Sequence, residues 1–348
     1  MLKERVAFRL PAPPVSGLLR PRLLLVCLVL LLATFAVFCL GMTIGDFPLS
    51  VSDVVPALFG SGSSGSTYIV QELRLPRALV GLLAGLAFGA SGAIFQTVTR
   101  NPLGSPDMIG INAGATTAVV AGISLGFGSG LGTTTLGLLG GLLTAVVVYL
   151  LAWRQGTSGY RILLVGIGIY AMCQSLTDYL LTKADITEAQ ASIGWLVGNL
   201  ANRGWEHVRP LAFALAVLLP LVLLMSRWMR TLQLGDDVAA GLGTPVQPAR
   251  LGLLLAGAAL VAFATASAGP IAFVALAAPQ VAQRLAGLAW PPIAASALTG
   301  SFIVLTSDVL ARSIFPSSSL PVGIVTGVLG APLLLWLLTR ANRSGSGG

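Results

Sequence analysis

The stretch from residue 74 to residue 114, RLPRALVGLLAGLAFGASGAIFQTVTRNPLGSPDMIGINAG, decides the fold of this chain. Its first part is a long apolar run, and about 20 such residues at ~1.5 Å rise per residue cross a bilayer as a helix. A polar segment, Arg100–Asp107, follows, and its prolines Pro102 and Pro106 must interrupt the helix before the next apolar run. The stretch therefore predicts two membrane-spanning helices joined by a polar turn.

Small residues recur along the first of these helices. Gly81, Gly85, Gly89 and Gly92 are spaced three or four residues apart, which places them on one face of a helix. A face without side chains lets neighbouring helices approach closely. We expect this face to pack against other helices of the same chain.

The composition of the whole chain indicates a membrane protein. Hydrophobic residues make up 55% and charged residues 9%, with a mean hydropathy of +0.89, whereas about 25% of the residues in soluble domains are charged. The net charge of +8 could suggest nucleic-acid binding, but the basic residues occur singly at the ends of apolar runs, as in membrane proteins. An all-α polytopic membrane protein without a nucleic-acid partner is predicted.

The apolar runs divide the chain into predicted spans and tails. A cytoplasmic N-terminal tail over 1–21, a transmembrane domain over 22–340 and a flexible C-terminal tail over 341–348 are expected. Ten spans of adequate length are predicted near residues 22–42, 75–98, 108–127, 131–153, 161–182, 208–226, 250–268, 272–287, 292–312 and 322–339. The first apolar run is longer than that of a cleavable signal, so we expect it to remain as the first helix.

The basic residues predict the orientation. Both ends of the chain are basic, which favours the cytoplasm for both and requires an even number of spans. Of the 20 basic residues, fourteen then fall on the cytoplasmic side and six, Arg74, Arg77, Lys183, Arg203, Arg209 and Arg312, fall outside. A multi-pass protein of a bacterial cytoplasmic (inner) membrane, with both termini cytoplasmic, is predicted.

Shorter segments and isolated polar residues complete the pattern. Residues 48–59 and 190–200 are too short to span and are predicted to lie on the outer surface, with Trp195 as an interfacial aromatic. Asp178 and Asp308 are acids near span interiors, yet both lie close to an outer end, which favours an interfacial place over a functional one. No metal-ligand cluster, catalytic pair or phosphate-binding loop is present in the sequence.

Several blocks of the sequence, taken together, resemble the iron-siderophore (FecCD) permease family of ABC importers, which is related to the permease of the vitamin B12 importer. The resemblance covers about residues 22–340. It rests on blocks that keep the family's order, namely Arg74–Arg77, Gln96, Asn101–Pro106, Gly110–Ala115, Gly194–Gly198, Leu234–Ala239, Gly269–Val274, Leu320–Gly323 and Gly330–Pro332. One departure is Gln280, at a position where many members carry histidine.

The resemblance implies the fold of a type II ABC importer permease and three groups of functional residues. Arg74, Arg77 and Arg312 would dock acidic residues of a substrate-binding protein, although anchoring to lipid headgroups is the alternative for each arginine. The segment at about 231–244 would couple to the ATPase, through Leu234, Gly235, Asp236, Asp237, Val238, Ala239, Gly241, Leu242 and Gly243, with a short helix over Asp236 to Gly241. Asn101, Leu103, Thr157 and Ser158, in two turns, would close the pathway towards the cytoplasm.

The resemblance also implies the partners. These are a second permease subunit, identical or paralogous, two ABC ATPase subunits that hold ATP and magnesium, and a substrate-binding protein; the chain itself is expected to bind no cofactor and no metal. Ferric siderophore is the expected cargo, with haem or cobalamin as alternatives. From different classes, an ion-coupled secondary transporter would require acids at the bilayer midplane, and an intramembrane enzyme would require a paired nucleophile and base.

Overall fold

The computed structural model describes residues 6–10, 15–45, 47–127, 132–153, 159–314 and 320–345, and most of them are helical. A short antiparallel hairpin, β1 (Val6–Leu10) and β2 (Val15–Leu19), precedes the first helix. The helices are α1 (Pro21–Thr43), α2 (Val51–Leu58), α3 (Ser64–Tyr68), η1 (Ile69–Arg74), α4 (Leu75–Thr99), α5 (Ile111–Ser124), α7 (Thr133–Ala152), α8 (Gly159–Lys183), α9 (Ile186–Leu196), α10 (Trp205–Leu224), α11 (Ser226–Leu232), α12 (Asp236–Gly241), α13 (Val246–Ala268), α14 (Val274–Ala286), α15 (Ile293–Ile314) and α16 (Val322–Gly345).

Each of the ten predicted spans contains one of these helices, and the all-α polytopic class is confirmed. Within the described residues, seven helices are long and apolar enough to cross a membrane: α1, the continuous helix Ser64–Thr99, α7, α8, α10, α13 and α15. The span predicted over 108–127 was too long, because α5 covers only Ile111–Ser124. Gly110 precedes it with a φ of 84°, a left-handed conformation that starts the helix only after the turn.

The helix that contains α4 begins earlier than predicted. Residues Ser64–Thr99 form one continuous helix, in which the π-helical turn η1 precedes α4. Pro76 lies in the first turn of α4 and cannot donate a backbone hydrogen bond to the preceding turn. The wider π-helical turn η1 lies directly before Pro76, where the backbone N–H donor is missing.

Helix α4 lies at the centre of the bundle, and its predicted glycine face is confirmed. A Cβ added at Gly89 would collide with the Ser296 carbonyl of α15, and one at Gly92 would collide with the Ala275 carbonyl of α14. The two neighbours therefore pack directly on the backbone of α4, an approach that only glycine allows.

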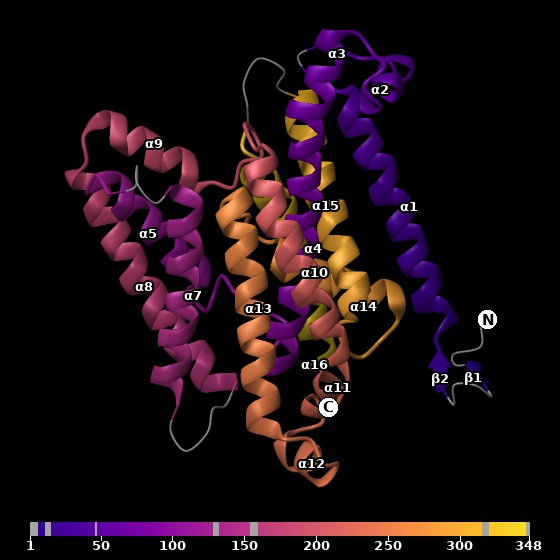
Figure 1. Cartoon of the computed structure of the whole chain (residues 1–348). Coiled ribbons are helices and arrows are strands. Elements are labelled where there is room, and N and C mark those ends of the chain that lie inside the picture. The colour runs from indigo at the N-terminus through magenta and orange to yellow at the C-terminus, as the bar shows by residue number, and fades with distance from the viewer. Residues whose placement is uncertain are drawn as a thin grey trace.

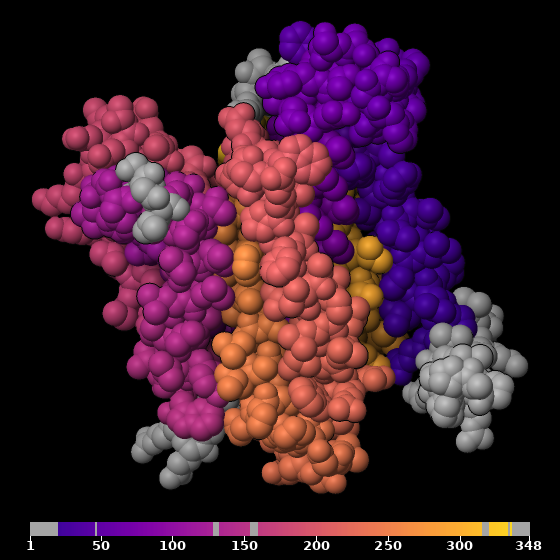
Figure 2. Space-filling view, viewed as in Figure 1, coloured from indigo at the N-terminus to yellow at the C-terminus, as the bar shows by residue number. Residues whose placement is uncertain are grey.

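The helices form two groups that meet at α13 (Figure 1). Helices α5, α7 and α8 stand on one side, with α9 across their end. Helices α4 and α10 pack on the other face of α13, and α14 and α15 pack against α4. Gly141 of α7 lies against Ala262 of α13, so the groups touch through small residues. The space-filling view shows α13 exposed between α7 and α10 (Figure 2).

The two ends of the bundle carry different short elements, and the short helices that the sequence predicted lie at one of them. Helices α2, α3 and α9 lie at one end, while α12, the β1–β2 hairpin and the end of α16 lie at the other (Figure 1). The short helices expected in 48–59 and 190–200 are therefore present at one end, although α9 starts earlier, at Ile186. The expectation for Trp195 was wrong in detail, because it is buried against Ala115 and Val119 instead of interfacial. The β1–β2 hairpin lies within residues 1–21, and α16 extends beyond Arg340 to Gly345.

Candidate functional site

The end of the bundle at which α1 ends and α4 begins is held by a buried carboxylate between two arginines. Asp308 of α15, with a side chain only 3% exposed, accepts from Nη2 of Arg77 at 2.7 Å and pairs with Nη2 of Arg312 at 2.9 Å. Arg312 lies one helical turn after Asp308, whereas Arg77 comes from α4. The expectation of an interfacial place for Asp308 was wrong, because the carboxylate joins two central helices.

The two arginines Arg74 and Arg312 also fix the end of α1. Nη1 of Arg312 donates to the carbonyl oxygens of Gly41 and Ile44, at 3.1 and 2.7 Å. Nη1 of Arg74 donates to the Met42 carbonyl at 2.6 Å, and its Nη2 donates to the carbonyl of Phe47. Cations satisfy the free carbonyl groups at the C-terminus of a helix and complement its dipole. The three arginines predicted at the outer mouth therefore lie together and contact this chain.

At the opposite end, the predicted coupling segment, about 231–244, contains the end of α11, a turn and α12, and the prediction of a helix over Asp236–Gly241 is confirmed. Gly235, with a φ of 108°, permits the turn before α12. The side chains of Leu234, Val238 and Leu242 are four residues apart and 60%, 50% and 62% exposed. Ala239, in contrast, is buried. The segment thus presents an apolar face away from the bundle, and such a face indicates a partner surface.

Asp236, the first residue of α12, is bound to two other helices. Its Oδ1 accepts from Nη2 of Arg100 at 2.7 Å and from Nη2 of Arg250 at 2.7 Å. Arg100 ends α4, and Arg250 lies in the first turns of α13. The other acid, Asp237, is exposed.

The turn predicted as a gate begins directly after Arg100. Arg100 has a φ of 52°, and the side-chain Oδ1 of Asn101 accepts from the backbone N–H of Leu103 at 2.9 Å, an Asx turn. Thr157 and Ser158 lie outside the described residues. The next residue, Gly159, is so close to α4 that an added Cβ would lie 2.7 Å from the Thr99 Cα. The segment after α4 and the start of α8 are therefore neighbours.

Three polar side chains, linked by hydrogen bonds, connect the turn before α5 to α13. Asn112 donates from Nδ2 to Oδ1 of Asp107, and its own Oδ1 accepts from the buried Thr265 of α13 at 2.6 Å. Asp107 as a whole residue is half-buried, and burial of its carboxyl raises the pKa to about 6. The hydrogen bond from Asn112 lowers this pKa and so acts in the opposite direction. These three residues attach the polar turn to α13.

A second polar contact joins α4 and α14. Gln280 donates from Nε2 to Oε1 of Gln96 at 2.6 Å, and Gln96 donates to the carbonyl oxygen of Leu276 at 3.0 Å. Both partners are uncharged amides, so this contact does not titrate.

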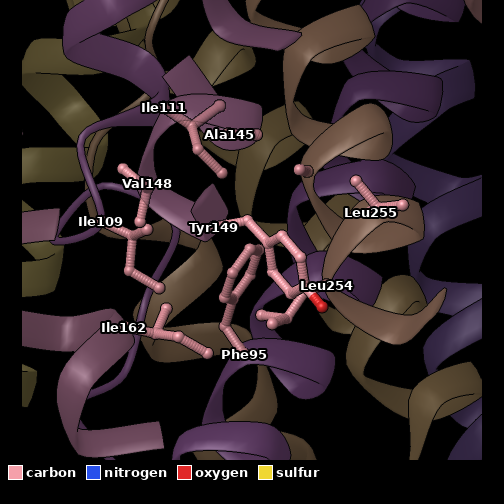
Figure 3. A pocket seen from close by; sticks show the side chains of 10 residues that line it. Phe95, Ile109, Ile111, Ala145, Val148, Tyr149, Ile162, Leu254 and Leu255 are labelled. Atoms are coloured by element: carbon pink, nitrogen blue, oxygen red, sulfur yellow. The ribbon is translucent and has the colours of Figure 1, made fainter. Parts of the chain in front are cut away.

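A cavity of about 20 Å³ lies between α4, α7, α8 and α13 and is lined by apolar side chains, with Tyr149 beside Phe95 and Leu254 (Figure 3). It holds no more than a water-sized molecule. In the described residues, no three His, Cys, Asp or Glu side chains gather as metal ligands.

Comparison with known proteins identifies the family. The sequence model of the FecCD transport family matches residues 30–340. This chain belongs to the FecCD transport family.

The curated relatives of this FecCD-family protein match it along almost the whole chain. The ferric enterobactin transport system permease protein FepG of Escherichia coli is 41% identical over 323 residues, which cover 92% of this chain and 98% of the relative. The iron(3+)-hydroxamate import system permease protein FhuG of Bacillus subtilis is 37% identical over 328 residues, with 92% and 98% covered. FepD, a second permease protein of the ferric enterobactin system, is 35% identical over 323 residues, with 91% and 96% covered.

A solved structure agrees with this assignment. The FecCD-family chain superimposes on a metal-chelate type ABC transporter in an inward-facing conformation with a TM-score of 0.79 and 27% identity, covering 91% of this chain and 99% of that chain. The match extends the family resemblance from sequence to fold.

Two functional contacts in this FecCD-family protein were not predicted from its sequence. The partners of Asp308 were missed because Arg77 and Asp308 are 231 residues apart. The partners of Asp236 were missed although Arg100 and Arg250 each flank a polar interruption of the chain. The available signal was one arginine at the end of a predicted span and another at the start of a different span, together with an acidic turn. That pattern does not tell which of these charges form ion pairs.

Proposed function

We propose that this chain is a permease subunit of an ATP-driven ABC importer and forms the pathway by which ferric siderophores enter the cytoplasm. The observation that carries the proposal is the family match over residues 30–340, joined to an exposed apolar face on the coupling segment. The relatives' names supply the cargo class, since FepG and FhuG are named for ferric enterobactin and iron(3+)-hydroxamate.

The proposed assembly contains this chain, a second permease, two ATPase subunits and a substrate-binding protein. The chain is similar to FepG and to FepD, two permease proteins of one transport system, which supports a paralogous partner beside the alternative of an identical one. ATP and magnesium are held by the ATPase subunits, and this chain performs no hydrolysis. The assembly lies in a bacterial cytoplasmic membrane, with both termini and α12 on the cytoplasmic side.

The ATPase subunits bind the coupling segment at about 231–244. Leu234, Val238 and Leu242 enter an apolar groove of the ATPase, because their exposed apolar surface gains most from burial. Gly235, Gly241 and Gly243 shape the turns at both ends of α12, and the exposed carboxylate of Asp237 gives the contact a polar edge. Ala239 packs α12 against the bundle.

The substrate-binding protein docks at the end that carries Arg74, Arg77 and Arg312. Arg77 is the most exposed of the three side chains and makes direct contact with acidic residues of the partner, while Arg74 and Arg312 add positive potential from below the surface. Such charges chiefly raise the association rate. The rate of association measured between 50 mM and 500 mM salt therefore falls steeply; a rate independent of salt would contradict docking through these arginines.

The gate towards the cytoplasm consists of Asn101 and Leu103, together with Thr157 and Ser158. The contact of Gly159 with Thr99 supports this assignment, since it places the start of α8 beside the end of α4, after which the Asx turn at Asn101 follows.

Uptake of radiolabelled iron tests the proposed function. Cells that lack this chain and cells that regain it are offered a panel of ferric siderophores, with haem and cobalamin as controls. Restoration by one siderophore class is expected. If the complex assembles but no siderophore restores uptake, ferric siderophores are not the cargo. Restoration by haem or cobalamin alone would identify that compound as the cargo instead.

A further inference from the structure

The contacts of Asp236 join three parts of the molecule that are far apart in sequence. The acid begins α12, Arg100 ends α4 directly before the turn at Asn101, and Arg250 lies in the first turns of α13. The same oxygen, Oδ1, accepts from both arginines. One carboxylate therefore links the start of α12 to both α4 and α13.

The two ion pairs differ in burial. The side chain of Arg250 is 1% exposed, and it holds both carboxylate oxygens of Asp236, at 2.7 and 2.9 Å. A buried guanidinium that loses its carboxylate remains as an uncompensated charge, so this pair does not separate easily. Arg250 thus anchors the start of α12 to α13.

The pair with Arg100 is much more accessible. The side chains of Arg100 and Asp236 are 42% and 38% exposed. Water and salt compete for such a pair, which contributes little to stability and can open without unfolding its surroundings. Asp236 therefore combines a permanent contact with a releasable one.

The releasable contact lies beside the gate turn. Arg100 adopts a left-handed conformation, φ 52°, and its backbone N–H still donates to the carbonyl oxygen of Thr97 at 3.2 Å. A second side-chain contact runs parallel to it, from Nε2 of Gln233 to the hydroxyl of Thr97 at 3.2 Å. The end of α4 is thus attached to the coupling segment at two residues, Thr97 and Arg100, both directly before the chain turns towards Asn101.

We propose that the ion pair between Arg100 and Asp236 is a latch that transmits displacement of the coupling segment to the gate turn, while Arg250 keeps α12 attached to α13. The inference deepens the proposed function and rests on it, since it assigns the residue pair through which ATPase movement reaches the gate. Arg100 and Asp236 are positioning residues in this scheme, and neither contacts the cargo.

The main test replaces Arg100, one residue of the proposed latch, in the complete importer. Arg100→Gln removes the charge but leaves the Arg250 anchor, and Arg209→Gln, an exposed arginine of α10 outside the coupling segment, is the matched control. In proteoliposomes with the ATPase subunits and the binding protein, Arg100→Gln is expected to keep ATP hydrolysis within about twofold of the parent and to lower iron uptake about tenfold or more. Arg100→Lys, which retains the charge, is expected to restore part of the uptake, and Arg209→Gln to change neither rate.

Other outcomes would overturn the latch. These are an Arg100→Gln complex that does not assemble, hydrolysis and uptake that fall in proportion, or uptake that stays at the parent level. Failure of the parent complex to take up any ferric siderophore would instead contradict the proposed function, and it is recognised because the parent is measured first.

A second measurement does not depend on the cargo. Hydrogen–deuterium exchange of the purified chain is compared between the parent and Arg100→Gln. Faster exchange is expected in the segment 101–104, with exchange in α12 unchanged because Arg250 still holds it. Unchanged exchange in 101–104, or equal acceleration in α12, would show that the pair does not connect the two segments as a latch.

Discussion

Arg77 of α4 donates to Asp308 of α15 from both Nε and Nη2, at 3.1 and 2.7 Å to the same carboxylate oxygen. Asp308 also meets Arg312, which in turn caps the carbonyl groups at the end of α1. One buried carboxylate therefore fixes the outer ends of three helices relative to one another.

Replacing Asp308 with asparagine should destabilise the chain strongly. The change leaves Arg77 and Arg312 close together without the carboxylate between them, and removal of one partner from a buried ion pair costs about 3–5 kcal/mol. Thermal unfolding in detergent measures the effect. Asp178→Asn, at an exposed acid whose carboxylate accepts a hydrogen bond from Gln174 at 3.1 Å, is the control and should stay within about 0.5 kcal/mol. Equal stability of the two variants would contradict the structural role of Asp308.

A methyl group on the glycine face of α4 should prevent normal packing. In Gly89→Ala the Cβ meets the backbone carbonyl of Ser296, which cannot move aside as a flexible side chain could. We expect a loss of about 3 kcal/mol or of the folded protein altogether, measured by the monodisperse yield and by thermal unfolding. Gly168→Ala, in α8 with open space around it, is the matched control and should be tolerated. A stable Gly89→Ala chain would mean that α4 and α15 are further apart.

The carboxyl of Asp107 should make stability depend on pH. Burial raises its pKa from 3.8 to about 6, so the folded chain holds a proton that the unfolded chain releases. This contribution is fully present below about pH 4 and is lost as the pH rises through about 6. Asp107→Asn keeps an acceptor for Asn112 and removes the charge, so the unfolding temperature at pH 7 should rise by a few degrees, about 1 kcal/mol or more. Unfolding temperatures of both chains between pH 4 and pH 7 check the sign; an unchanged slope in the variant would assign the dependence to other groups.

The amide pair between α4 and α14 should contribute a modest, pH-independent stabilisation. Gln280→Ala leaves Oε1 of the buried Gln96 without its donor, and an unsatisfied buried polar atom costs about 1–3 kcal/mol. Gln283→Ala, on the same helix and half-buried, serves as the control. The difference between the two variants should be the same at pH 5 and pH 8. A difference that vanished at one pH would point to a titrating partner at this position.

The local sequence pattern predicts where the helices are but not always where they end. Apolar length places a helix in each of the ten spans, yet α5 is shortened by the left-handed Gly110 and α4 is extended by η1. Boundaries depend on backbone conformation in turns, which composition describes poorly. Trp195 shows the same limit for a side chain. Its place near a helix end suggests an interface, but the packing of α9 on α5 buries it.

For the candidate site, the residue types were available from the sequence and their partners were not. Arg74, Arg77, Arg312 and Asp236 stand at helix ends, and that position alone marks them as polar groups at the ends of the bundle. Whether such a group faces a partner protein, a lipid headgroup or another helix depends on contacts between residues that are remote along the chain.

The sequence by itself determined the membrane class, the number of apolar segments and the glycine face of α4, because each depends on residues that are close along the chain. Only the tertiary structure decided that Asp308 joins Arg77 to Arg312 and that Asp236 joins Arg100 to Arg250. Each of these carboxylates had several basic residues as possible partners. The packing of α4 against α13 and α15 selects among them, since a buried ion pair forms only where the backbones bring both charges within reach of one another.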